Sequence, residues 1–142
     1  MLKYLKKKQY SIVFVFCLLL VLPACSLKKI SEKKAMLLYQ DGLKLSAKGD
    51  FKGAMEKFNQ SADISEKNGF SYGMAHNYNE IGNLYTYGRQ YDKAREYFKK
   101  ALGIYKKEDM PTEVSKILDN IAKTYLKQGE FQKSLEKYEK LV

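Results

Sequence analysis

Beyond residue 34, apolar residues recur every three or four positions, which is the spacing of one face of a helix. Tyr78, Ile81 and Tyr85 show this spacing in the middle of the chain. The apolar stretches are separated by the segments AKGDF, YGRQY and KQGEF, which are typical of tight turns between helices. The chain has two prolines and few β-branched runs, which favours helices over strands. The pattern therefore predicts an all-α fold of amphipathic helix pairs.

The helical stretches repeat at an interval of 40 residues. A small residue recurs at Gly42, Gly82 and Ala122, where it allows the first helix of a pair to approach the second closely. No helix pair can bury its apolar face alone, so neighbouring pairs are expected to stack. The other matching positions are Leu45, Tyr85 and Tyr125; Phe51, Tyr91 and Phe131; Ala54, Ala94 and Ser134; and Phe58, Phe98 and Tyr138.

This spacing of small and aromatic residues resembles the tetratricopeptide repeat (TPR). The resemblance covers residues 35–142 and implies a right-handed α-solenoid of three TPR-like helix pairs, at about 35–69, 70–109 and 110–142. Whether the last pair is complete is left open. The usual repeat has about 34 residues, so the second helices should be longer and run through ADISEKNG and ALGIYKKED. The long spacing resembles the variant seen in kinesin light chains and in peptide-sensing bacterial regulators.

The first 24 residues follow a different pattern. Four lysines precede an uninterrupted apolar run at residues 12–22. A helix needs about 20 residues to span a bilayer, so this run is too short for an ordinary membrane anchor. It fits the hydrophobic region of a secretory signal peptide instead. An uncleaved signal anchor and a buried apolar helix are the alternatives.

The sequence LPAC at residues 22–25 resembles the bacterial lipobox. In that family the cysteine thiol is acylated, the chain is cut before the cysteine, and the new amine is acylated as well. The resemblance implies a signal peptide at residues 1–24, lipidation of Cys25 with a chain such as palmitate, and a basic tether at residues 25–34. It also implies a lipid-anchored protein of the bacterial cell envelope. Ser26 lacks the acidic character of an inner-membrane retention signal, so the outer membrane, facing the periplasm, is expected in a cell with two membranes.

The formal charge of +10 is concentrated near the N-terminus. Residues 35–142 hold 18 basic and 15 acidic side chains, so the repeats are nearly balanced. Alternating charges of this kind are typical of solvated helix faces. Binding of nucleic acid requires a concentrated basic patch, which the repeats lack, so no nucleic-acid partner is expected.

One stripe of each first helix is expected to line a concave groove. Gln40, Glu80 and Asn120 occupy identical repeat positions in it. Long-repeat relatives use amides there to hold the backbone of an extended peptide, since an amide both donates and accepts hydrogen bonds. The groove changes from apolar to basic along the chain, which predicts a partner segment with an apolar end and an acidic end; ordinary solvated helix positions are the alternative. The expected groove residues are Tyr39, Gln40, Leu43, Asn79, Glu80, Asn83, Tyr87, Lys116, Asn120, Lys123 and Lys127.

The repeats offer little for catalysis. His76 is the single histidine, and neither a P-loop nor a zinc-ligand spacing occurs, so no catalytic residue, metal site or cofactor is expected. The sequence therefore predicts a non-catalytic protein-interaction adaptor, for example in envelope or pilus assembly. A peptide or small-ligand sensor that acts through a partner protein is the alternative. The given sequence has no polar capping helix after Leu135, Tyr138 and Leu141. Three alternatives stay open: these side chains are partly exposed, they cover each other in a homo-oligomer, or they belong to a truncated chain.

Overall fold

The structure of the chain, a computed structural model, describes residues 26–139 except for the side chains of residues 135 and 137–139. The expected signal peptide, Cys25, Leu141 and the side chains of Leu135 and Tyr138 lie outside this part. The described residues form helices and no strand. A first helix covers residues 26–47, and it is followed by α2 (Phe51–Asn68), α3 (Ser71–Tyr87), α4 (Tyr91–Lys107), α5 (Pro111–Gln128) and α6 (Phe131–Glu139).

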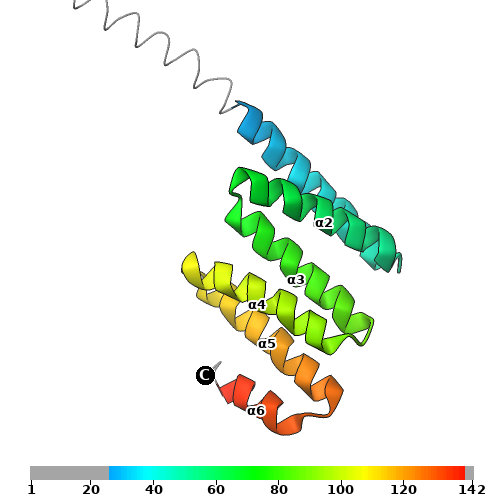
Figure 1. The fold of residues 1–142 in the computed structure, drawn as a ribbon, viewed down its shortest axis with the longest axis vertical. Coiled ribbons are helices and arrows are strands. Elements are labelled where there is room, and N and C mark those ends of the chain that lie inside the picture. The colour runs from blue at the N-terminus through cyan, green and yellow to red at the C-terminus, as the bar shows by residue number, and fades with distance from the viewer. Residues whose placement is uncertain (1–25, 140–142) are drawn as a thin grey trace, which may run out of the picture.

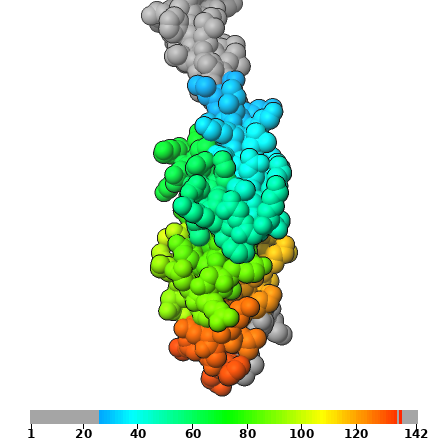
Figure 2. Space-filling model, turned by 90° about the vertical axis from the view of Figure 1, so that its right-hand side faces the viewer, coloured from blue at the N-terminus to red at the C-terminus, as the bar shows by residue number. Residues whose placement is uncertain are grey.

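The helices stack in chain order along the long axis of the molecule (Figure 1). Each helix from α2 onwards packs against the next one, and α3 also contacts α5. Figure 2 shows the same order from blue to red in the space-filling view. The predicted all-α, TPR-like solenoid is therefore confirmed.

The two helices of a pair are held close together by a glycine beneath a buried phenylalanine. A Cβ atom at Gly82 would lie 2.6 Å from Cε1 of Phe98, and one at Gly42 would lie 2.6 Å from Cε1 of Phe58. Both phenylalanine side chains are only 1% exposed, so neither has space to move aside. The recurrence of small residues at 40-residue intervals thus has the packing role that the sequence predicts.

The turns and the long second helices also follow the sequence prediction. Gly49 and Gly129 adopt the left-handed conformation, with φ angles of 81° and 83°. Arg89 takes the same role in the second turn, with a φ angle of 56°. Helices α2 and α4 contain 18 and 17 residues, which accounts for the interval of 40 between pairs.

The described part of the expected basic tether is helical. Residues 26–34 continue without a break into the first helix, and Ser31 donates a hydrogen bond to the Leu27 carbonyl at 3.1 Å. No glycine or proline interrupts residues 26–41, which explains why the helix extends so far. The lysines of this segment therefore sit on a regular helix that leads directly into the first repeat.

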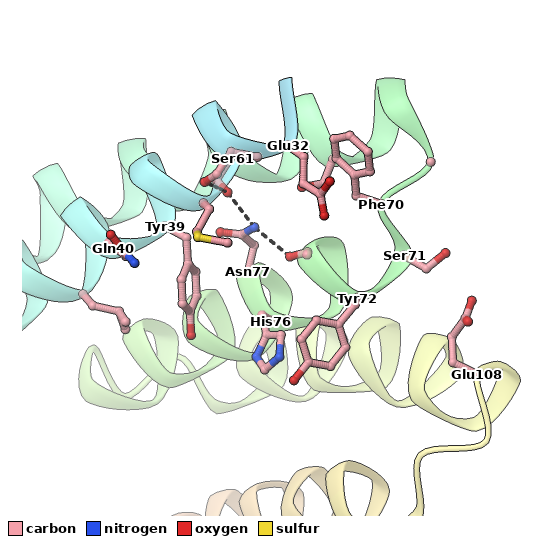
Figure 3. Close-up of a pocket in the computed structure, with 16 residues that line it drawn as sticks. Glu32, Tyr39, Gln40, Ser61, Phe70, Ser71, Tyr72, His76, Asn77 and Glu108 are labelled. Atoms are coloured by element: carbon pink, nitrogen blue, oxygen red, sulfur yellow. Dashed lines mark hydrogen bonds between the residues drawn. The ribbon is translucent and has the colours of Figure 1, made fainter. Parts of the chain in front are cut away.

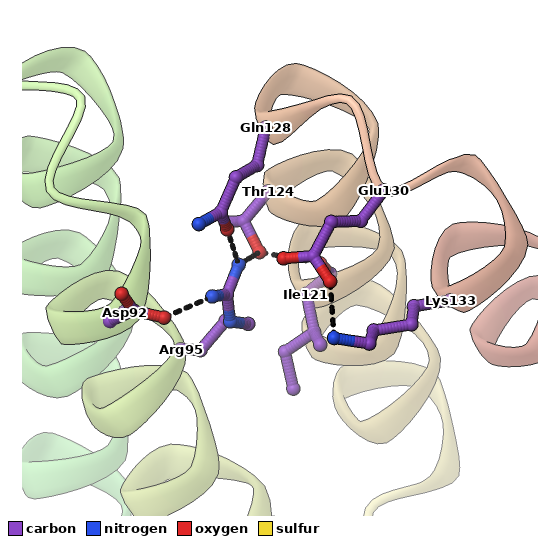
Figure 4. Close-up of polar contacts among 7 residues, drawn as sticks. All are labelled: Asp92, Arg95, Ile121, Thr124, Gln128, Glu130 and Lys133. Atoms are coloured by element: carbon purple, nitrogen blue, oxygen red, sulfur yellow. Dashed lines mark hydrogen bonds and ion pairs between the residues drawn. The ribbon is translucent and has the colours of Figure 1, made fainter.

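A buried arginine joins the second helix pair to the third (Figure 4). Arg95 of α4 is 6% exposed and donates hydrogen bonds to Gln128 Oε1 at 2.7 Å and Thr124 Oγ1 at 3.4 Å. Its guanidinium also pairs with Asp92 and lies 4.2 Å from the ring centroid of Tyr125. A buried charge requires such compensation, so these contacts fix α4 against α5.

The glycine contact yields a matched pair of stability predictions. Gly82→Ala should lower the free energy of unfolding by about 1–3 kcal/mol, because the new methyl group overpacks against Phe98. Gly103→Ala should raise it by about 0.5–1 kcal/mol, because Gly103 lies within α4 and a Cβ atom there meets nothing within 4 Å. Urea denaturation followed by circular dichroism measures both changes, and a destabilisation of equal size in both variants would contradict the packing role of Gly82.

Candidate functional site

The residues expected in the groove all lie on the first helices of the three pairs, which are residues 26–47, α3 and α5. We call the face that they form the inner face. Two pockets lie on it. Asn79 and Lys116 line neither of these two pockets. The N-terminal pocket, of about 630 Å³, includes Tyr39, Gln40 and Leu43; the C-terminal pocket, of about 650 Å³, includes Glu80, Asn83, Tyr87, Asn120, Lys123 and Lys127.

Beside the C-terminal pocket, the expected amides and Glu80 form hydrogen bonds with one another. Asn120 of α5 donates to Asn79 Oδ1 of α3 at 3.0 Å, and Asn79 donates in turn to Glu80 Oε1 at 3.0 Å. Asn83 donates to the other carboxylate oxygen of Glu80 at 3.1 Å. A carboxylate is a strong acceptor, and these bonds orient the amides and join α3 to α5. Glu80 and Asn120, which occupy identical repeat positions, therefore belong to one hydrogen-bond network through Asn79. The sequence did not reveal this connection.

Lysines give the C-terminal pocket a basic side. Lys123 and Lys127 both line it, and Lys123 forms an ion pair with Asp119 one helical turn earlier. Arg89 lines the same pocket from the turn that follows α3. These cations lie beside the Glu80 network, so the pocket offers charge to an acidic group together with oriented polar side chains.

The N-terminal pocket has aromatic walls (Figure 3). The rings of Tyr72 and His76 meet edge to face at a centroid distance of 4.1 Å, and Tyr39 lies 5.9 Å from His76. Met36 and Leu43 also line the pocket and are 56% and 40% exposed. The apolar character that the sequence predicts for this end of the groove is therefore present. Tyr72 was not among the residues that the sequence indicated.

The floor of the N-terminal pocket is polar. Asn77 donates hydrogen bonds to Ser61 Oγ at 2.9 Å and to the Gly73 carbonyl at 2.8 Å, and Ser61 donates to the Ala35 carbonyl at 2.7 Å (Figure 3). Among the residues that the structure describes, Asn77 Oδ1 and Ser65 Oγ have no hydrogen-bond partner, although both residues are 1% exposed. Ser61, Ser65 and Asn77 are not among the residues that the sequence indicated, because the two serines belong to α2 and Asn77 lies outside the stripe of α3 expected to line the groove.

Burial in the pocket wall favours the uncharged forms of Tyr39 and His76. Burial lowers the pKa of His76 from its usual 6.5, and the nearby carboxylates of Glu80 and Glu113 only partly oppose this shift. Burial raises the pKa of Tyr39 to about 12, with Glu80 adding to the shift. Tyr39 therefore keeps its hydroxyl proton and His76 is mostly a neutral imidazole.

Neither a metal-ligand cluster nor a membrane-spanning helix is found in the described part of the chain. No group of three or more histidine, cysteine, aspartate or glutamate side chains is placed to hold a metal ion among residues 26–139. Within the same residues, no helix has the length and apolar character to cross a membrane.

Comparison with known families identifies the chain's relatives. Residues 19–142 match the family of the soluble NSF attachment protein, SNAP. The chain belongs to the SNAP family. A comparison with curated proteins finds no match. The spacing of small and aromatic residues indicated the TPR resemblance but not this family.

Solved TPR structures share the fold of this SNAP-family chain. The TPR domain of Arabidopsis FLU has a TM-score of 0.73 at 15% identity, over 78% of this chain and 93% of that domain. The apo form of RapI has a TM-score of 0.73 at 21% identity, over 80% of this chain and 41% of RapI. The N-terminal domain of stress-induced protein-1 from C. elegans has a TM-score of 0.67 at 12% identity, over 78% of this chain and 84% of that domain. This type of fold is typical of protein-interaction adaptors and is generally a non-catalytic scaffold; no enzyme family matches.

His76 provides a direct test of the N-terminal pocket, because it is the single histidine of the chain. We expect its pKa to lie below 6.5 in NMR titrations of the protein labelled at histidine. Glu80→Gln should lower the pKa further, since the carboxylate favours the imidazolium, and Lys116→Gln should raise it by removing a repelling charge. A wild-type pKa above 6.5, or shifts of the opposite sign in the two variants, would contradict the described environment.

Proposed function

We propose that this chain is a non-catalytic adaptor that binds an extended segment of a protein partner along its inner face. The observation that carries the proposal is the pair of pockets of similar size on that face, one walled by aromatic rings and one lined by lysines. Exposed apolar side chains such as Met36 and Leu43 beside the first pocket are typical of contact surfaces. A SNAP-family solenoid is also a suitable scaffold for such binding.

The chemistry of the two pockets suggests the character of the partner segment. An apolar or aromatic end suits the N-terminal pocket with Tyr39, Tyr72 and His76. An acidic end suits the C-terminal pocket, where Lys123 and Lys127 lie beside oriented amides. Amide groups such as Asn83 and Asn120 suit a peptide backbone of any sequence.

We also propose that Cys25 is lipidated and holds the adaptor at the bacterial envelope. The proposal rests on LPAC at residues 22–25 and on the short apolar run before it. Two acyl chains on one residue give stable attachment, whereas one chain gives marginal attachment. In a cell with two membranes, the proposed location is the outer membrane, facing the periplasm, where the adaptor serves envelope or pilus assembly.

A charge-reversal pair tests the partner site. A photo-crosslinking amino acid at Tyr87, which is 70% exposed at the C-terminal pocket, should give one specific adduct in intact cells. Lys123→Glu with Lys127→Glu should reduce that adduct at least tenfold, because an acidic segment is then repelled. Lys99→Glu with Lys106→Glu, at exposed positions of α4, changes the net charge equally and should leave the adduct unchanged. Equal adducts from both double variants would exclude the lysine pocket as the binding surface.

Mass spectrometry of the native N-terminus tests the anchor. The mature chain should begin at Cys25 and carry acyl groups, and it should partition into the detergent phase. Cys25→Ser should leave the signal peptide uncut, because the lipobox cysteine is both the acyl acceptor and the cleavage marker. A native product that starts at Met1 without added mass would overturn the lipoprotein proposal.

A further inference from the structure

The two interfaces between consecutive helix pairs are built from equivalent positions, and three buried positions beside the N-terminal pocket differ in polarity between them. With the 40-residue offset, Ala101, Tyr105 and Ile117 of the second interface correspond to Ser61, Ser65 and Asn77 of the first. The residues of the second interface are buried members of one apolar cluster. Those of the first interface are equally buried, at 1% exposure each, yet all three are polar.

The N-terminal pocket lies where the second interface holds an aromatic ring. Ser61, Ser65 and Asn77 all line this pocket. In the second interface, the ring of Tyr105 lies 5.9 Å from His76 and 6.3 Å from Tyr72. The residues equivalent to His76 and Tyr72 in the first interface are Met36 and Glu32, and both line the N-terminal pocket. An aromatic guest would therefore meet surroundings that correspond to those of Tyr105.

The polar floor of the pocket also indicates which chemical group the bound aromatic ring needs. Both amide hydrogens of Asn77 are used, one by Ser61 Oγ and one by the Gly73 carbonyl, so its orientation is fixed. Asn77 Oδ1 is left as an acceptor, and Ser65 Oγ is a second polar atom without a partner among the described residues. A buried acceptor of this kind is stabilised by a donor O–H or N–H group. The ring that fits the space therefore needs a hydrogen-bond donor.

We propose that the N-terminal pocket binds an aromatic side chain with a hydrogen-bond donor, tyrosine or tryptophan, from the partner segment. Its ring occupies the space that Tyr105 fills in the second interface, and its O–H or N–H donates to Asn77 Oδ1. The assignment of this ring to a protein partner rests on the proposed adaptor function. The exposed apolar side chains of Met36 and Leu43 beside the pocket suit a peptide chain that lies across its mouth. The carboxylates of Glu32 and Glu108 at the pocket disfavour an acidic guest.

Amino-acid amides test the pocket without the unidentified partner. The probes are N-acetyl-tyrosinamide, N-acetyl-tryptophanamide and N-acetyl-phenylalaninamide, and saturation-transfer NMR measures their binding to the full chain in detergent micelles. Wild type should bind the tyrosine and tryptophan probes at least fivefold more tightly than the phenylalanine probe, which lacks a side-chain donor. Failure of the wild type to bind any of the three, or equal binding of all three, would overturn the proposal.

A matched variant places the residues of the second interface in the first. Ser65→Tyr combined with Asn77→Ile should fill the pocket, reduce binding of the tyrosine probe at least tenfold, and raise the thermal midpoint. The same micelles are present in both samples, so probe partition into detergent cancels in the comparison. Asn77→Leu serves as a second variant that keeps the space but removes the acceptor, and it should bind the tyrosine and phenylalanine probes equally. Undiminished tyrosine binding by either variant would show that the ring binds elsewhere.

A separate experiment tests whether the bound ring comes from the protein partner or from a free small molecule. The pocket-filled variant should also lose the crosslinked adduct at Tyr87, whereas reversal of Lys123 and Lys127 should leave probe binding unchanged. If the pocket-filled variant loses probe binding but keeps the full adduct, the guest is a free small aromatic molecule and the partner assignment is wrong. Probe binding without any adduct would contradict the adaptor function while leaving the pocket chemistry in place.

Discussion

The fold depends on the close contact between a glycine of each first helix and a phenylalanine of the second. Gly42 lies under Phe58 and Gly82 under Phe98 with the same separation, so both pairs have the same internal geometry. Because the first helices then sit at a constant distance from the second ones, successive pairs stack in the same way. The inner face is the result of this regular stacking, and its side chains can differ between repeats without disturbing the pairs.

The two interfaces between the pairs show how a regular scaffold can carry different chemistry. Tyr105 and Ile117 close the second interface with apolar packing, whereas Ser65 and Asn77 at the matching positions leave the first interface open. The polar residues lose apolar burial and leave acceptors unpaired, which is costly for stability alone. Such a local conflict with good packing is typical of functional positions. The buried Arg95 is different, since its charge and hydrogen bonds are compensated by neighbouring side chains.

Much of the fold followed from the sequence because the helices are local and the repeat is regular. The 40-residue interval predicted the turns, the long α2 and α4, and the role of Gly42 and Gly82. The candidate site was harder to predict, since it depends on contacts between helices. The bond from Asn120 to Asn79 and the arrangement around Glu80 join side chains that no spacing rule connects. Ser65 and Asn77 did carry a signal, namely polar residues where the next repeat has Tyr105 and Ile117, but it gains meaning only when both positions are known to be buried.

The long first helix links the proposed anchor to the pockets. It is continuous from residue 26 to residue 47, so it provides a rigid connection instead of a flexible tether. A helix rises about 1.5 Å per residue, which places Tyr39 roughly 20 Å along the helix from its first described residue. Leu27 and Ile30, at the beginning of this helix, are 65% and 62% exposed. Apolar side chains beside lysines suit a membrane interface. With the proposed lipid at Cys25, the N-terminal pocket therefore lies nearer the bilayer than the C-terminal pocket, and the bound segment has a defined direction, with its aromatic end toward the membrane.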